Sequence, residues 1–275
     1  AKNYGEGSAW AKKQTDPEVV SKAIAASERA VRQQAMRYHE RAQKEHQQAD
    51  FEHAAELYRA HIEAFPSAAQ SYDSTFYLAE ILFHRLRKPE QAGDYYLRAA
   101  RQNPQGKFTK DALYNAIVAF ESVRTKELSG CKVGGVQPPL AAAGAEAKVD
   151  RCGETETDHK FSDAVALYVK QYPNDPEVPG ILFRQGRLYF DRGIYDPAIR
   201  QFGQLLDSYP QSEFAASAGE LVLESFNRAK DYGNIERWAR KLKTAPAFQN
   251  ADSQRKLDAL ILQSVFKFGE QLADK

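Results

Sequence analysis

Residues 179–210 read PGILFRQGRLYFDRGIYDPAIRQFGQLLDSYP, and this stretch decides the fold. Its apolar spacing predicts two short helices, over 181–191 and 197–208. Gly186 is small where the two helices must approach, and Phe202 is large enough to fill the space between them. A helical hairpin of this length cannot bury its apolar face alone, so the stretch predicts neighbours of the same kind stacked on it.

The same pattern recurs elsewhere in the chain. The segments FEHAAELYRAHIEAFP (51–66) and KPEQAGDYYLRAARQNP (88–104) match YDPAIRQFGQLLDSYP (195–210). In each segment an Ala precedes an aromatic residue by four positions, so both side chains lie on one helix face. The prolines that end successive repeats are 37 or 38 residues apart, except for one interval that is longer because it holds an inserted segment. Such a period with helix-pair content predicts a solenoid.

We therefore predict an all-α protein, a right-handed α-solenoid of about five stacked helix pairs with capping helices. Residues 1–16 are aperiodic and are expected to form a flexible arm. One superhelical domain is predicted over 17–275, beginning at a helix start marked by Asp16 and Pro17. Gly, Pro and small residues replace the apolar period at about 127–157, which predicts a loop inserted within the third pair.

The quoted stretch resembles the tetratricopeptide repeat, with Leu182, Gly186, Tyr189, Ala198, Phe202 and Pro210 at the positions where that family carries its motif. Glu80 and Ile117 stand where two other repeats would carry the Gly. The long period and the Phe-Pro or Tyr-Pro endings resemble bacterial envelope proteins of the BamD type and of the CpoB (YbgF) type. The motif residues of the family are structural, so the resemblance implies a scaffold for protein partners and no enzyme activity.

Composition and motifs exclude several classes of function. A net charge of +1 gives no reason to expect nucleic acid or a charged membrane surface as a partner. The sequence contains no apolar run near the roughly 18–20 residues that span a bilayer. It also contains no phosphate loop, nucleophile elbow or metal-ligand spacing, so we expect no catalytic residue, no metal and no cofactor.

The two cysteines, Cys131 and Cys152, both lie in the inserted segment. One interpretation is two unrelated free thiols. The other is a disulfide that closes a loop of about 20 residues, which would contribute on the order of 3 kcal/mol. Such a bridge would indicate an oxidising compartment.

A recognition surface is the remaining prediction. The first helices of a helix-pair stack line its concave side, and their positions outside the core follow from the helical period. Aromatic residues and Arg are favoured at interfaces, and an extended or helical peptide would suit such a groove. The alternative is that the apolar members pack against neighbouring repeats or under the inserted segment. The predicted groove consists of His39, Gln43, His46, Tyr77, Ile81, His84, Tyr114, Val118, Glu121, Phe183, Arg187 and Phe190.

These observations predict a non-catalytic scaffold that holds a partner protein or peptide in a multiprotein assembly. The repeat subtype and the candidate bridge favour the periplasm or cell envelope of a bacterium, in outer-membrane assembly, envelope coordination, or a motility or secretion machine. Because the chain begins without Met, a removed N-terminal signal or membrane anchor also fits. Two alternatives are open. One is a cytoplasmic co-chaperone or regulatory adaptor, for which only Arg187 supplies a groove cation, and the other is a helper domain of a larger enzyme.

Overall fold

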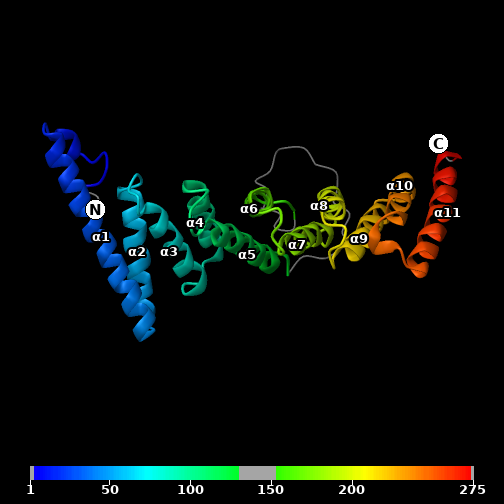
Figure 1. Ribbon diagram of the computed structural model, residues 1–275, viewed down its shortest axis with the longest axis horizontal. Helices are drawn as coiled ribbons and strands as arrows, with labels where there is room; N and C mark the ends of the chain where they lie inside the picture. Colours follow the sequence, from blue (N-terminus) through cyan, green and yellow to red (C-terminus); the bar gives the residue numbers. More distant parts are fainter. Residues whose placement is uncertain (1–2, 130–152, 274–275) are drawn as a thin grey trace, which may run out of the picture. The chain divides into compact units, whose positions relative to one another are not determined.

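The computed structural model describes residues 3–129 and 153–273, which are helical over most of their length (Figure 1). Over these residues eleven α-helices and two short 3-10 turns follow one another without a strand, which confirms the predicted all-α class. Cys131, Cys152 and their candidate bridge lie outside the described residues. The helices are η1 (Ala11–Lys13), α1 (Pro17–Glu45), α2 (Gln48–Ala64), α3 (Ser71–His84), α4 (Pro89–Gln102), α5 (Thr109–Leu128), α6 (Glu156–Gln171), α7 (Val178–Phe190), α8 (Tyr195–Ser208), α9 (Ala215–Arg228), α10 (Tyr232–Lys243), η2 (Pro246–Phe248) and α11 (Ala251–Ala273).

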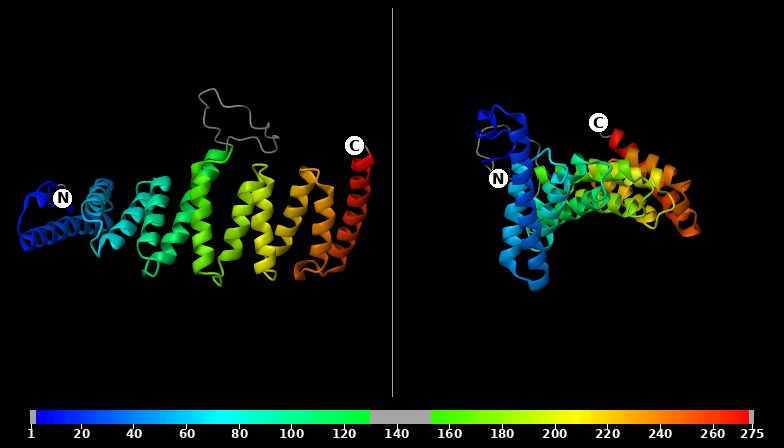
Figure 2. Two further views of the ribbon diagram at one scale, coloured as in Figure 1. Left: turned by 90° about the horizontal axis from the view of Figure 1, so that it is seen from above. Right: turned by 60° about the vertical axis from the view of Figure 1, so that its left-hand side comes forward.

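The helices fall into two compact units. The first unit comprises 3–126 with 155–171, and the second comprises 172–273 with 127–129 and 153–154. In the first unit α1 packs on α2, α2 on α3, and α3 on α4 (Figure 2). In the second unit α7 packs on α8, α8 on α9, α9 on α10, and α10 on α11 in the same way. The predicted packing of sequential helix pairs is confirmed, whereas a single domain over 17–275 stays a prediction.

The quoted stretch folds as its small and large residues predict. Gly186 of α7 is buried, and a Cβ atom built there would collide with the ring of Phe202 on α8. Phe202 and Ala198 are 0% exposed. Gly193 turns the chain between the two helices with a φ of +74°, a value that side chains with a Cβ rarely adopt. The close approach of α7 and α8 therefore depends on Gly186.

The first helix begins where the sequence predicts, at Pro17. The Asp16 carboxylate accepts the backbone N–H of Glu18 at 2.8 Å and caps the helix. The residues before it are anchored on α2, because the Glu6 N–H donates to the Ala64 carbonyl at 2.8 Å. Gly5 is buried at this contact, where a Cβ would lie too close to Ala64.

A buried ion pair joins α5 and α6, the two helices of the third pair, which flank the inserted segment. Arg124 Nε, near the end of α5, donates to Asp158 Oδ1 at 2.9 Å, and both side chains are 0% exposed. The other carboxylate oxygen of Asp158 accepts the N–H of Thr155 at 2.8 Å and its hydroxyl at 3.1 Å. One carboxylate therefore caps the first turn of α6 and binds α5.

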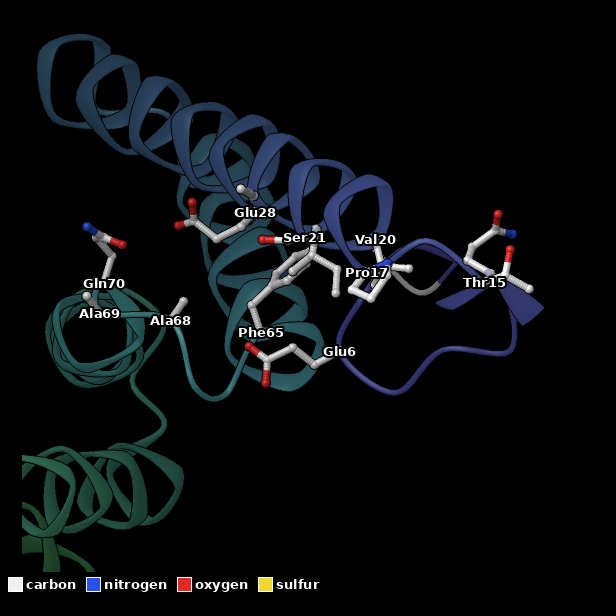
Figure 3. Close-up of a pocket in the computed structure, with 13 residues that line it drawn as sticks. Glu6, Thr15, Pro17, Val20, Ser21, Glu28, Phe65, Ala68, Ala69 and Gln70 are labelled. Atoms are coloured by element: carbon white, nitrogen blue, oxygen red, sulfur yellow. The ribbon is translucent and has the colours of Figure 1, made fainter. Parts of the chain in front are cut away.

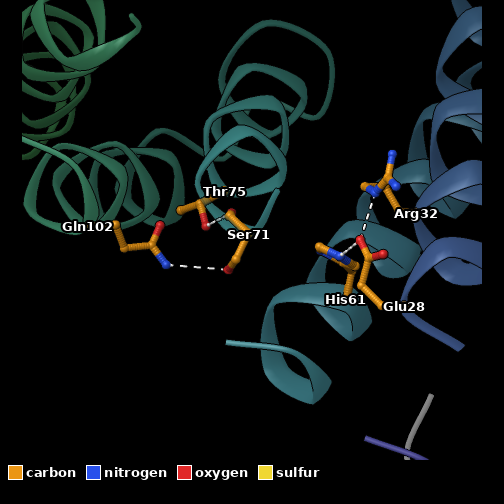
Figure 4. Close-up of polar contacts among 6 residues, drawn as sticks. All are labelled: Glu28, Arg32, His61, Ser71, Thr75 and Gln102. Carbon is orange, nitrogen blue, oxygen red and sulfur yellow. Dashed lines mark hydrogen bonds and ion pairs between the residues drawn. The ribbon is translucent and has the colours of Figure 1, made fainter. Parts of the chain in front are cut away.

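A buried polar contact joins α1 to α2 (Figure 4). His61 is fully buried, and its Nε2 lies 2.9 Å from Glu28 Oε1, which also accepts Arg32 Nε at 2.7 Å. Burial lowers the pKa of His61, so the ring is neutral at pH 7 and donates from Nε2. Burial would raise the pKa of Glu28, yet the hydrogen bonds from Arg32 and His61 lower it below its ordinary value.

Candidate functional site

Five of the predicted groove residues lie together in the first unit. A pocket of about 240 Å³ opens between α1 and α3, and we call it the α1–α3 pocket. Residues four apart on a helix lie on one face, which explains why His39 and Gln43 project from α1 together and Tyr77 and Ile81 from α3. Its lining residues are His39, Gln43, Phe76, Tyr77, Glu80, Ile81, His84 and Arg85.

Aromatic rings form one wall of the α1–α3 pocket. The ring of His39 meets those of Tyr58 and Tyr77 edge-on, with centroids 5.9 and 6.1 Å apart. Tyr77 in turn contacts the ring of Phe108 at 5.6 Å, and Phe76 stacks on Phe108 at 4.3 Å. Edge-to-face and stacked pairs of this kind hold ring orientations, so the wall is formed before any partner arrives.

His39 is a neutral group in this wall at pH 7. Burial lowers the pKa of His39, and the positive charge of Arg85 lowers it further, while Glu40 opposes both. The neutral ring can donate from Nδ1 to the Tyr58 hydroxyl, 3.4 Å away, and accept the Gln43 amide at Nε2, 3.2 Å away. The imidazole therefore acts as a polar part of the wall.

The carboxylate of Glu80 is engaged by neighbouring helices. It accepts the Tyr96 hydroxyl of α4 at 2.5 Å and the Asn115 amide of α5 at 3.1 Å. Burial, and then the bond to Glu80, raise the pKa of Tyr96 well above its ordinary value. Arg85 lies at the exposed rim, with its guanidinium 5.0 Å from the Phe51 ring centroid. The pocket thus combines an aromatic wall with a cation at its edge.

Three pocket residues were missed by the sequence reasoning, namely Phe76, Glu80 and Arg85. A signal existed for Glu80, because it replaces the small Gly that the repeat carries at this position of the first helix. Its partners Tyr96 and Asn115 come from two other helices. No local pattern marks Phe76 or Arg85 as neighbours of α1.

The remaining groove residues of the first unit lie outside the pocket lining. His46 is exposed and ends α1 with a φ of +55°. Tyr114, Val118 and Glu121 are half-buried along α5, and the Tyr114 ring contacts Tyr168 of α6 at 6.2 Å. Their part in binding stays a prediction.

Burial corrects the expected exposure of two groove residues. Ile81 is only 1% exposed, so almost none of its side chain is accessible in the α1–α3 pocket that it lines. Phe190, in the second unit, is 7% exposed because Tyr195 and Arg228 cover its ring, at 6.0 and 5.0 Å. Both belong to the core, as the packing alternative expects.

The other two predicted residues of the second unit differ from each other. Phe183 is half-buried, with its ring 5.2 Å from Phe214 and 5.8 Å from Phe202. Arg187 is exposed and pairs with Asp191 at 3.1 Å, one turn along α7. Phe183 thus fills space between helices, and Arg187 remains accessible.

A second hollow lies where the N-terminal residues meet α1 and the α2–α3 turn (Figure 3). Its volume is about 560 Å³, and Phe65 faces Val20 and Ser21 of α1 across it. Glu6 projects into the same space from the anchored arm. This hollow forms where the N-terminal residues lie against α1 and the α2–α3 turn. No predicted groove residue is among its described lining.

Comparison with known families places one segment securely. Residues 181–212, which hold most of α7, α8 and the turn that follows, match the family model of the tetratricopeptide repeat. The chain carries a tetratricopeptide repeat. The resemblance drawn from residues 179–210 is therefore confirmed for this segment. Tetratricopeptide repeats typically serve as non-catalytic scaffolds for protein partners, in agreement with the predicted class of function.

A search of curated proteins found no match to the chain. Among solved structures, the MamA RS-1 ArsTM double mutant is 10% identical with a TM-score of 0.38, over 82% of this chain and 97% of that one. A tetratricopeptide repeat protein from Parabacteroides merdae is 15% identical with a TM-score of 0.40, over 89% and 76%. The assembly chaperone of RpL4 (Acl4) is 12% identical with a TM-score of 0.27, over 87% and 98%. With TM-scores below 0.5, these likenesses carry no assignment.

No helix of the described residues is long and apolar enough to cross a membrane.

Proposed function

We propose that the protein is a non-catalytic interaction scaffold that binds a segment of a partner protein in the α1–α3 pocket. The observation that carries the proposal is the preformed aromatic wall, in which His39, Tyr77 and Tyr58 fix one another. At about 240 Å³ the pocket is smaller than the roughly 300–1,000 Å³ of typical small-molecule sites. Its size suits one or two side chains of a peptide.

The chemistry of the lining indicates which side chain would enter. Tyr77 and Phe76 favour an aromatic or aliphatic anchor, because burying such a group is the main source of affinity at interfaces. The Gln43 amide and the Arg85 guanidinium at the rim can donate to a backbone carbonyl or a carboxylate beside that anchor. An extended or helical segment with one large apolar residue next to an acidic residue fits this arrangement.

A bacterial envelope assembly is the setting that we propose for the scaffold. Its support is the 37–38-residue period with Phe-Pro and Tyr-Pro endings. A thiol count on the unfolded, unreduced protein tests the compartment, with no reactive thiol expected if Cys131 and Cys152 are bridged. Two reactive thiols would remove the main chemical argument for an oxidising compartment.

Selection from a displayed library of random peptides tests the pocket directly. Peptides that bind the wild-type protein are expected to share an aromatic or large aliphatic anchor. Tyr77→Ala removes part of the wall, and Gln43→Trp fills the pocket from an exposed position of α1. Each change is expected to weaken the selected peptides by at least about tenfold.

A matched control is available on the same helix. Gln34 is exposed and lies about two and a half turns before Gln43, so Gln34→Trp adds the same ring to the opposite face of α1. This variant is expected to bind the peptides as the wild type does. If Gln43→Trp and Gln34→Trp bind equally well, the peptides occupy another surface and the proposed site is wrong.

A further inference from the structure

The C-terminal helix α11 has two unlike faces. One face packs on α10 through Leu257 and Ser264, which are 4% and 2% exposed. The opposite face is apolar and open, with Leu262 at 75% exposed, Val265 at 51% and Phe266 at 67%. Residues three or four apart share a helix face, so these side chains form one stripe. We call it the α11 outer face.

Gly269 lies on the same stripe, three residues after Phe266. A Cβ atom built at Gly269 meets nothing within 4 Å. A glycine inside an exposed helix is less stable than Ala by about 1 kcal/mol and needs a compensating reason. In this protein the other glycines of the described helices show what that reason is.

Each of those other glycines is a seat for an aromatic ring. A Cβ built at any of them would lie within about 3.5 Å of a ring carried by a helix or turn further along the chain. At four of the six the Cβ would crowd the ring, so glycine lets the two backbones approach closely enough for the ring to fit, whereas at Gly180 and Gly233 a Cβ would make an ordinary contact at 3.4 and 3.5 Å. The pairs are Gly93 with Phe120, Gly180 with Phe214, Gly186 with Phe202, Gly203 with Trp238, Gly219 with Phe248, and Gly233 with Phe268.

We propose that the α11 outer face is a dimerisation surface, on which Phe266 of a second copy of this chain occupies the seat at Gly269. The face continues the series of glycine–ring contacts made by α4 and by α7 to α10. It is also self-complementary, because ring and seat are one turn apart on the same helix. Two α11 helices packed antiparallel about a two-fold axis fill both seats at once, as an isologous interface requires.

The exposed area agrees with a weak dimer. At about 200 Å² for each large apolar side chain, the exposed parts of Leu262, Val265 and Phe266 amount to on the order of 400 Å². Two copies would bury roughly 800 Å² of apolar surface, below the ~1,200 Å² at which standard specific interfaces begin, which is the range of weak and transient contacts. The proposed dimer is therefore weak and reversible.

Sedimentation equilibrium of the full chain between about 1 and 300 µM tests the proposal. The wild type is expected to pass from monomer to dimer over this range. Phe266→Ala removes the ring, and Gly269→Ala fills the seat. Each is expected to weaken dimerisation by at least about tenfold. Gln263→Ala, at an exposed position beside the stripe, is the matched control and should dimerise as the wild type does.

The melting temperature of the dilute monomer separates this proposal from a fold defect. Gly269→Ala should melt at the same temperature or higher, because Ala favours the helix and its Cβ meets no atom in the monomer. A dimer weakened in a monomer that is no less stable supports the seat. The proposal is overturned by a wild type that stays monomeric throughout, or by a dimer that neither variant weakens.

Discussion

Replacing Arg124 with Met is the sharpest test of how the third helix pair is held together. The change keeps an unbranched apolar stem but removes the guanidinium that binds Asp158. The Asp158 carboxylate is 0% exposed, so it would remain buried without the Arg124 guanidinium. Met fills most of the space that Arg124 leaves, and the effect therefore reports mainly on charge.

The magnitude follows from the burial. Breaking a buried ion pair by removing one partner destabilises a protein by about 3–5 kcal/mol, because a desolvated charge is left behind. Removing both charges at once is much less harmful. We expect the double variant Arg124→Met with Asp158→Asn to recover most of the lost stability. The Asn oxygen can still accept the Thr155 N–H at the start of α6, as the Asp158 carboxylate does now.

Urea unfolding followed by helical circular dichroism measures these differences. With a denaturant slope of about 2 kcal/mol per M, Arg124→Met should lower the midpoint by about 2 M. Lys22→Met serves as the control, because Lys22 pairs with Glu18 on the surface, with both side chains about three-quarters exposed. Such a pair contributes roughly 0–1 kcal/mol.

Two results would refute this reasoning. One is an Arg124→Met variant that loses no more stability than Lys22→Met. The other is a double variant that is no more stable than Arg124→Met alone, which would mean that packing and not charge holds the pair.

Three further predictions concern other parts of the chain. Gly186→Ala should lower the free energy of unfolding by about 1–2 kcal/mol in thermal or urea melts, because the clash with Phe202 outweighs the gain in helix propensity; a more stable variant would contradict the close contact. Asp16→Ala should lower the free energy of unfolding by about 1 kcal/mol because the helix loses its cap. An unchanged free energy would show that α1 does not start at this cap. Burial holds the folded pKa of His61 below the unfolded pKa of 6.5, so its stabilising effect is complete above pH 6.5 and is lost as the pH falls from 6.5 through the lower, folded pKa. Glu28 adds a further loss of stability below its unfolded pKa of 4.5. We expect His61→Gln to flatten the upper part of a plot of urea midpoint against pH. An unchanged slope would show that His61 does not titrate in this way.

Helices and their starts could be predicted from the sequence because they depend on neighbouring residues. The cap at Asp16 and the fit of Gly186 to Phe202 both follow from spacings of a few tens of residues or fewer. The repeat period then located the insertion between α5 and α6. These features need no knowledge of how one pair is rotated against the next.

The exposure of the predicted groove residues could not be predicted in the same way. Ile81 and Phe190 occupy positions outside the repeat motif, yet neighbouring helices cover them. Phe76 and Arg85 join the α1–α3 pocket only because α3 lies against the preceding pair at one particular rotation. Glu80 is held by hydroxyl and amide groups of two later helices. Such contacts depend on backbone placement, which a single sequence does not specify.

The order of the glycine–ring pairs has a consequence for synthesis of the chain. In every filled pair the glycine precedes its ring, as Gly186 precedes Phe202 and Gly203 precedes Trp238. At roughly 5–20 residues per second, a nascent chain on the ribosome therefore shows an empty glycine surface for a few seconds before the matching ring emerges.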